Sequence, residues 1–173
     1  YTGQAQTPTQ EVKDGSTVLT QDTDYTLSYA DNTNVGTATV TITGIGDYSS
    51  ITTVTFNITK AALTITADDK SKSFGDSEPT LTASYAGFVS GEDQGDLSGT
   101  LSISRALGEV ANTYAITALG LTSTNYAVTY VDGVFTIANK LITSTDITTA
   151  TIADLVYTGQ AQTPTQEVKD GST

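Results

Sequence analysis

The feature that most constrains the fold is a strict alternation of apolar residues with threonine. Residues 37–43 read TATVTIT, and residues 53–59 read TVTFNIT. Successive side chains of a β-strand point to opposite faces, so this period directs one apolar face to a core and one hydroxyl-bearing face to water. Both segments are therefore predicted to be half-buried strands. A slip of one residue would move each apolar set into solvent, so the register is well specified.

The same alternation recurs along the chain and is interrupted at short intervals by turn-forming residues. Clusters such as KDGS, DNTN, GIGD, FGDSEP and VDG separate the alternating runs. Helical periodicity never exceeds a single turn, which residues 92–97 could form. Frequent short strands with polar turns predict an all-β fold of small, Ig-like β-sandwich modules. A β-grasp-like sheet with a very short helix is the alternative.

A long repeat defines the domain organisation. Residues 1–17 recur without a single change as residues 157–173, at an offset of 157 − 1 = 156. Seventeen identical residues do not arise by chance, so the chain is expected to come from a larger protein that repeats a 156-residue unit. Periods well above about 50 residues indicate arrays of whole domains rather than turns of a solenoid.

A weaker repeat divides this unit into two related modules. Equivalent positions in the two halves are Thr37 and Thr113, Tyr48 and Tyr126, Phe56 and Phe135, and Ile58 and Ile137. Each half then enters an aliphatic run, at 61–67 or 141–147, followed by an aromatic residue and a proline. We therefore expect three parts: residues 1–60, a first module lacking its first strand; residues 61–139, a complete second module; and residues 140–173, the first strand or strands of the next copy of the first module.

Short linkers predict an elongated rod. Residues 139–140 are all that separate the last predicted strand of the second module from the following aliphatic run. Modules of this size bury only about 60% of their unfolded surface, so neighbouring modules are expected to support one another through stiff contacts.

Composition excludes several classes of function. Seven Lys and Arg against 19 Asp and Glu give a net charge of −12, so the chain offers no basic surface to a nucleic acid or an anionic membrane. Histidine and cysteine are absent, which removes the usual general base, the usual transition-metal ligands and any disulfide. Paired carboxylates at Asp68 and Asp69 sit among turn-forming residues rather than across a cleft. We expect no enzyme, no nucleic-acid binding and no membrane insertion.

Two sets of residues carry a family resemblance. Residues 63–82, LTITADDKSKSFGDSEPTLT, followed by NTYAIT, NYAVTYVDG and FTI, resemble the MBG domain of the YGX type. Phe74 stands where that family usually has tyrosine, and Asn112 where glycine is common. YTGQAQTP with DYTLSY, NVGTATVTITGIGDY and TFNITK resembles the partner module commonly interleaved with it. The resemblance implies a tandem repeat of large bacterial surface proteins and adhesins, an extracellular location on the cell surface and no catalytic motif.

Calcium is the one cofactor that the acidic turns suggest. The chain has no EF-hand loop and no nonapeptide calcium repeat, and solvation of turn residues is the competing explanation for its carboxylates. The candidate ligands are Asp22, Asp24, Asp31, Glu92, Asp93 and Asp96.

Two functions remain open. The first is a structural stalk that extends and presents a distal binding domain. The alternative is an adhesive module that binds host glycan, mucin or protein through many weak sites, for which multiple copies would raise avidity. Exposed aromatic residues would serve such binding, and the candidates are Tyr85, Phe88 and Tyr130, although their alternation also fits a core.

The incomplete first module predicts a partner. An unpaired sheet edge invites the addition of a strand. Residues 141–156 of another copy carry the strand that residues 1–60 lack, so head-to-tail strand donation between copies is expected. Because such a contact is heterologous and need not close, it would produce chains or filaments.

Overall fold

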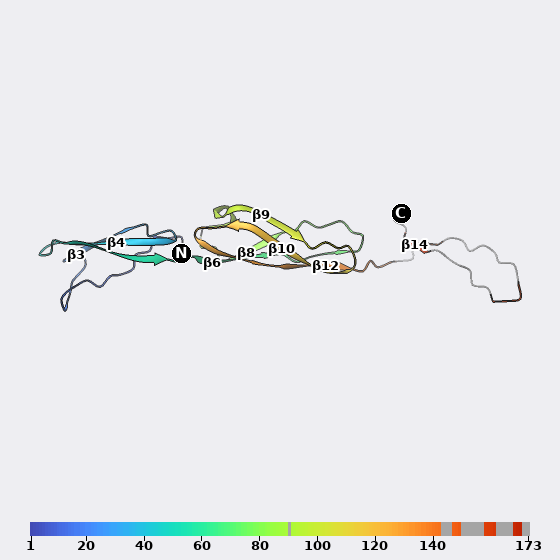
Figure 1. Cartoon of the computed structure of the whole chain (residues 1–173), viewed down its shortest axis with the longest axis horizontal. Coiled ribbons are helices and arrows are strands. Elements are labelled where there is room, and N and C mark those ends of the chain that lie inside the picture. Colours follow the sequence, from blue (N-terminus) through green and yellow to red (C-terminus); the bar gives the residue numbers. More distant parts are fainter. Residues whose placement is uncertain (90, 143–146, 150–157, 162–167, 171–173) are drawn as a thin grey trace.

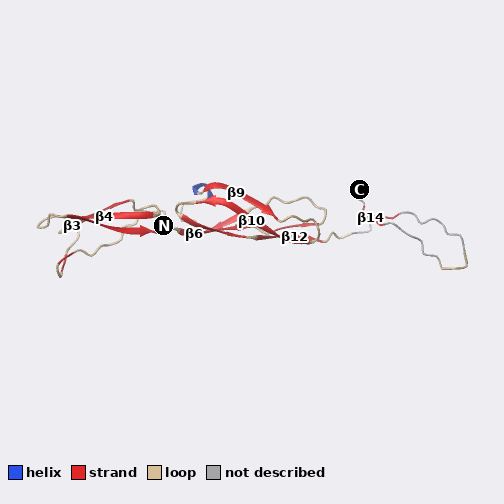
Figure 2. Ribbon diagram, viewed as in Figure 1, coloured by secondary structure: helices blue, strands red, loops and turns tan. Residues whose placement is uncertain are grey.

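The computed structural model describes residues 1–89, 91–142, 147–149, 158–161 and 168–170. Regular structure in these residues is entirely β-strand apart from one turn of 3₁₀ helix, η1 (Gln94–Asp96), which falls inside the segment 92–97. Figure 2 shows this single turn beside the strands. The all-β prediction is confirmed. Among the described residues, no helix has the length and apolarity needed to cross a bilayer.

The first module is built on one antiparallel sheet. Its strands β3, β4 and β5 are joined in that order, and β4 pairs with both neighbours along most of its length. Ala38 and Val40 of β4 are fully buried, as the alternation predicts. The strands are β1 (Lys13–Asp14), β2 (Thr17–Val18), β3 (Tyr25–Ala30), β4 (Gly36–Gly44) and β5 (Ile51–Ile58).

The second module has two sheets. One contains β11, β6 and β8 in that order, and the other contains β7, β12, β10 and β9. This arrangement is consistent with a β-sandwich. Its core contains Ala67, Ile116, Ala118, Phe135 and Ile137. The strands are β6 (Ala61–Ala67), β7 (Lys70–Ser73), β8 (Ala83–Ala86), β9 (Ser98–Arg105), β10 (Asn112–Thr122), β11 (Tyr126–Val131) and β12 (Gly133–Ala138).

Two parallel ladders close the second module. The first strand, β6, runs parallel to β11, and β7 runs parallel to β12. The two strands that open the module are therefore paired with the two that end it. Alternation predicts that a segment is a strand, but it carries no information on the direction of its neighbour. These long-range parallel pairs are what the sequence pattern alone does not predict.

The modules lie end to end along the long axis of the molecule (Figure 1). Between the end of β5 and the start of β6 there are only two residues, Thr59 and Lys60. Beyond Lys140, the described residues contain a short antiparallel pair, β13 (Ile147–Thr149) with β14 (Val168–Asp170). Most of the predicted third part, residues 143–146, 150–157, 162–167 and 171–173, lies outside the described residues. The three predicted domain boundaries stay predictions.

Replacing the buried Phe135 with alanine should strongly destabilise the second module. Its ring is fully buried in the core between the two sheets, so the substitution removes apolar contacts and leaves a cavity. We expect a loss of about 3–5 kcal/mol in the free energy of unfolding, measured by chemical denaturation. The matched control is Thr136→Ala, an exposed neighbour on the same strand, for which a loss within about 0.5 kcal/mol is expected.

Candidate functional site

Hydrogen bonds and aromatic contacts gather at the junction between the two modules. It forms where the start of the chain, the turn before β4 and the residues after β5 meet one end of the second module. We define the junction by the residues whose side chains or backbones cross it: Tyr1, Asn34, Val35, Thr59, Lys60, Phe88, Val89, Glu92, Ser123, Asn125 and Tyr126.

Asn125 is the central residue of the junction. Its side-chain oxygen accepts a hydrogen bond from the Val35 backbone N–H at 3.1 Å, and its amide nitrogen donates to the Asn34 side chain at 3.1 Å. The backbone oxygen of Asn125 accepts from the N–H of Ala61 at 3.0 Å. One residue of the second module thus binds both the turn of the first module and the start of β6.

A tight turn positions Asn125 for these contacts. The Ser123 hydroxyl accepts hydrogen bonds from the backbone N–H groups of Asn125, at 3.0 Å, and Tyr126, at 3.1 Å. Serine favours such local bonds to the backbone of the following residues. The Lys60 ammonium then donates to the Ser123 carbonyl at 2.8 Å, which ties the linker itself to the turn.

Aromatic rings pack beside this turn. The ring of Tyr126 is nearly inaccessible to solvent and contacts Tyr1 and Phe88 edge to face, with centroids 5.6 and 5.5 Å apart. The hydroxyls of Tyr1 and Tyr126 both donate to the carboxylate of Glu92. The bond to Glu92 raises the pKa of Tyr1 to about 12, while burial followed by the same carboxylate raises the pKa of Tyr126. Both phenols are therefore neutral donors at physiological pH.

The predicted calcium ligands do not gather around one point. Most of them instead lie in turns or bond to nearby backbone groups. Asp93 and Asp96 form a capping box at the N-terminal end of η1, where the Asp96 side chain accepts from the Asp93 N–H at 2.8 Å and the Asp93 side chain accepts from the Gly95 N–H at 2.6 Å. Asp24 accepts from the Thr20 N–H at 2.8 Å. Glu92 belongs to the junction. Asp22 and Asp31 adopt positive φ angles of 65° and 56° in turns. Within the described part of the chain, no three acidic side chains come together in a way that could hold a metal ion.

The predicted ligand-binding aromatics divide between the interior and the junction. The rings of Tyr85 and Phe88 lie 5.8 Å apart in a tilted arrangement, and Phe88 also contacts Tyr126. Tyr130 lies against the core, where its hydroxyl accepts from the Leu121 N–H at 2.6 Å and donates to the Leu121 carbonyl at 2.8 Å. Tyr85 and Tyr130 each lie opposite the fully buried Ile65, on its two sides, so both rings lie on the inner face of the sheet β11–β6–β8.

The predicted pair of carboxylates at Asp68 and Asp69 is likewise engaged in local bonds. Asp68 accepts from the Thr82 hydroxyl at 2.5 Å, and Asp69 accepts from the Val134 N–H at 2.7 Å. The bond from Thr82, followed by one from Ser84, lowers the pKa of Asp68. A general acid needs a raised pKa, so Asp68 is unsuited to that role.

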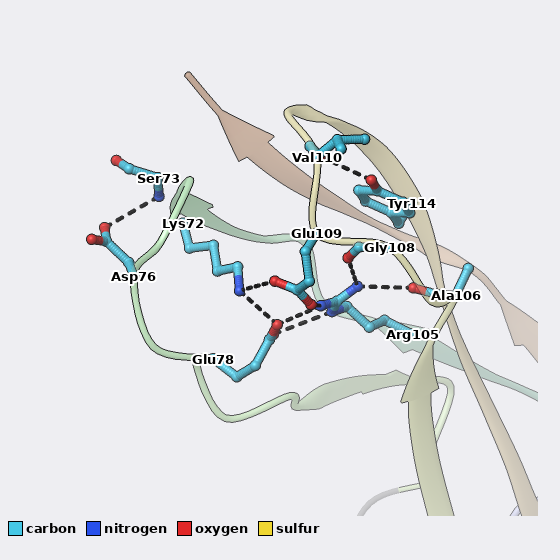
Figure 3. A network of polar contacts seen from close by, with 10 residues as sticks. All are labelled: Lys72, Ser73, Asp76, Glu78, Arg105, Ala106, Gly108, Glu109, Val110 and Tyr114. Carbon is cyan, nitrogen blue, oxygen red and sulfur yellow. Dashed lines mark hydrogen bonds and ion pairs between the residues drawn. The ribbon is translucent and has the colours of Figure 1, made fainter. Parts of the chain in front are cut away.

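A charge network lies at the opposite end of the second module (Figure 3). The sequence pattern did not predict it. Lys72 of β7 bonds Glu78 at 2.8 Å and Glu109 at 2.7 Å, and Arg105 of β9 binds the same two carboxylates. The side chains of both cations are largely buried, with exposed fractions of 5% and 12%. The guanidinium also lies over the Phe135 ring, 4.7 Å from its centre.

This network fastens two loops to the core, the one after β7 that carries Glu78 and the one after β9 that carries Glu109. Arg105 and Glu109 are four residues apart, but the network is completed by contacts between residues 27 and 37 positions apart, which spacing does not reveal. The sequence offers one indirect signal for such ion pairs. The chain has seven Lys and Arg against 19 Asp and Glu, so each basic residue has many possible acidic partners. The junction residues Asn34 and Asn125 offer no such signal, since asparagine is also an ordinary turn residue.

Comparison with known protein families gives a match to the second module. Residues 63–136 match the family model described as MBG domain (YGX type). The match begins in β6 and ends in β12, so it covers both sheets of the second module. No curated protein and no solved structure matches the chain.

Acid should weaken the second module through its charge network. Bonds from Arg105 and then Lys72 lower the pKa of Glu78 from 4.5 to about 2, and bonds from Lys72 and Arg105 lower that of Glu109. A carboxylate with a lowered pKa in the folded state stabilises the fold above its unfolded pKa, and this contribution is lost as the pH falls. We expect the melting temperature, followed by calorimetry, to drop as the pH is lowered from 4.5 towards 2.

Glu78→Gln tests whether the network causes this drop. The variant should melt at a lower temperature than the parent at neutral pH and show a shallower decrease below pH 4.5. Glu11→Gln is the matched control, because Glu11 pairs with the exposed Lys13 at 2.8 Å, and its pH profile should follow the parent's. Parallel profiles for Glu78→Gln and the parent would contradict the assignment.

Proposed function

Because residues 63–136 form an MBG domain of the YGX type, we propose that this chain is a spacer of a bacterial cell-surface protein, built to extend and present a distal binding domain. MBG domains are found in bacterial surface proteins, and a module of this type fits a repeated array. The proposal includes an extracellular location and the absence of catalysis. The residues 1–60 act in it as the interleaved partner module.

The junction is the observation that carries the proposal. A spacer holds a distal domain at a fixed distance only if its modules keep a fixed orientation. A linker of two residues leaves the modules little freedom to reorient. Bonds from Asn125, Lys60 and Glu92 span the boundary at several separate points, so bending would break more than one of them. A mere tether between independent domains would not need these contacts.

The surface and the repeat support the same function. Threonine makes up about a fifth of the chain and covers the outward faces of strands, which remain hydrated without basic residues. An unchanged 17-residue segment at a spacing of 156 residues supports an array that adds length by copying. The local use of the carboxylates at Asp68 and Asp69 supports a non-catalytic role.

Distance measurements between the modules test the spacer. The chain has no cysteine, so spin labels can be placed at Thr53→Cys of β5 and Thr100→Cys of β9, both exposed. We expect a narrow distance distribution by pulsed electron paramagnetic resonance. Asn125→Ala removes two hydrogen bonds across the junction, worth about 1–3 kcal/mol together, and should broaden the distribution.

Thr129→Ala is the matched control, since Thr129 is exposed on β11 of the same module and has no part in the junction. Its distribution should equal the parent's. A broad distribution in the parent chain, or no response to Asn125→Ala, would overturn the rigid-spacer proposal.

The adhesive alternative rests on the partly exposed pair Tyr85 and Phe88. A glycan and mucin binding screen separates it from the spacer. We expect no binding to the parent chain. Binding that is lost in Tyr85→Ala, while Thr129→Ala binds normally, would favour the adhesive function instead.

A further inference from the structure

The two parallel ladders of the second module share one register. Along β6 and β11 the paired residues are 126 − 61 = 65 positions apart, and along β7 and β12 they are 135 − 70 = 65 positions apart. The opening segment β6–β7 therefore lies beside the closing segment β11–β12 without a slip, although each segment passes from one sheet to the other. Together the two ladders form one parallel ladder, which we call the long ladder.

Hydrogen bonds beyond the strands extend the long ladder at both ends. The Ala61 N–H donates to the Asn125 carbonyl at 3.0 Å, and the Phe74 N–H donates to the Ala138 carbonyl at 2.9 Å. In both bonds the acceptor follows the donor by the same number of positions, 125 − 61 = 64 and 138 − 74 = 64. This is the offset expected for parallel strands whose paired residues are 65 positions apart. The ladder thus reaches from the entry of the module to its exit.

The crossing between the two sheets is bridged. The Asp69 carboxylate accepts a hydrogen bond from the Val134 N–H at 2.7 Å, so a side chain supplies an acceptor between β6 and β7. Gly133 lies so close to the Ala67 carbonyl that a Cβ built on it would be 2.3 Å from that oxygen. The absence of a side chain at Gly133 allows this close backbone approach. The opening and closing segments consequently stay in contact where they change sheets.

The connectivity of the chain sets the direction in which tension acts on the long ladder. Residues 59–60 join β5 to the start of β6, and residues 139–140 follow the end of β12. Figure 1 shows β6 beginning beside the first module and β12 ending on the far side. Because the segments are parallel, a pull along the chain draws β6–β7 towards the entry and β11–β12 towards the exit. The two segments are then sheared past each other along their length.

Shear is the direction in which a ladder of weak bonds resists force best. When two strands are pulled apart from the same end, their hydrogen bonds break one after another, and each bears the whole force in turn. When the strands are pulled from opposite ends, many bonds must break together before the strands slide. Since one hydrogen bond contributes only about 1 kcal/mol to stability, sharing the force among many bonds determines the barrier.

The core opposes the same sliding motion. Leu63 and Ile65 of β6 and Phe135 and Ile137 of β12 are each exposed by 2% or less. Side chains alternate between the two faces of a strand, so a slip of one residue would carry these apolar side chains out of their contacts and bring polar neighbours inward. Both the hydrogen bonds and the packing therefore fix the register against shear.

We propose that the second module is a mechanical clamp, in which the long ladder bears tension that passes along the chain. The clamp goes beyond the spacer, since a module can keep a fixed orientation and still open at low force. Its use on a cell surface rests on the proposed spacer function, in which a pull on the distal domain passes through this module. The resistance to force itself follows from the pairing within residues 61–138.

Pulling the full chain in two directions by single-molecule force spectroscopy tests the clamp. The chain has no cysteine, so handles can be attached to pairs of engineered cysteines at exposed positions. Thr59→Cys with Asn139→Cys pulls the long ladder in shear, whereas Thr59→Cys with Thr124→Cys pulls β6 and β11 apart from their shared entry end. At equal loading rate, the shear pair should rupture at a force at least about twice that of the second pair, because forced unfolding reports the unfolding barrier.

Proline substitutions in β7 test whether the ladder itself resists the force. Because the Phe74 N–H faces β12, the alternation of the strand makes the Lys70 N–H face β12 and the Ser71 N–H face away from it. Lys70→Pro removes a donor from one of the four residue pairs of this ladder and should lower the shear rupture force by about a quarter or more. Ser71→Pro is the matched control and should leave the force unchanged, since proline is tolerated where its missing N–H faces solvent.

Equal rupture forces in the two pulling directions would overturn the clamp, as would equal effects of the two prolines. Melting temperatures of the full-length variants establish that each is folded before it is pulled. If Lys70→Pro does not fold, the comparison of the two directions, which contains no proline variant, still decides. The distance distribution between the modules tests the spacer separately, so each proposal can fail without the other.

Discussion

The architecture depends on the parallel pairing of the strands that open and close the second module. β6 lies beside β11 and β7 lies beside β12, each pair running in the same direction. The chain consequently enters the module beside the start of β11 and leaves it beside the end of β7. Entry and exit therefore lie at opposite ends, and Figure 1 shows the first module extending away from the entry end. An antiparallel pairing of first and last strands would return the chain to its starting end.

The two ends of this module are stabilised by different chemistry. At the entry, neutral groups dominate: Asn125 bonds the turn of the first module, and two tyrosine hydroxyls share the carboxylate of Glu92. At the exit, Lys72 and Arg105 each bind Glu78 and Glu109 and hold two loops against the core. Since burial of both cations is compensated by two carboxylates, the network stabilises only while those carboxylates are ionised.

Alternation predicted the strands well wherever a strand has neighbours on both sides. Ala38 and Val40 of β4 are fully buried, and so are Leu63 and Ile65 of β6 to within 1%. The same pattern predicts that Val54 faces a core, but Val54 is 39% exposed. Val54 lies on β5, which among the described residues pairs with β4 on one side only. The alternation of apolar and polar residues specifies which face of a strand is apolar. It does not determine whether another element packs against that face.

By itself, the sequence determined the all-β class, the faces of the strands, the repeat of 156 residues and the MBG resemblance, because each follows from local period or direct identity. Only the tertiary structure decided the parallel ladders, the junction around Asn125 and the charge network. Those features join residues far apart in the chain, such as Val35 with Asn125 and Lys72 with Glu109. Local patterns carry no information on which distant segment a hydrogen-bonding group will meet, since that is set by how the sheets pack.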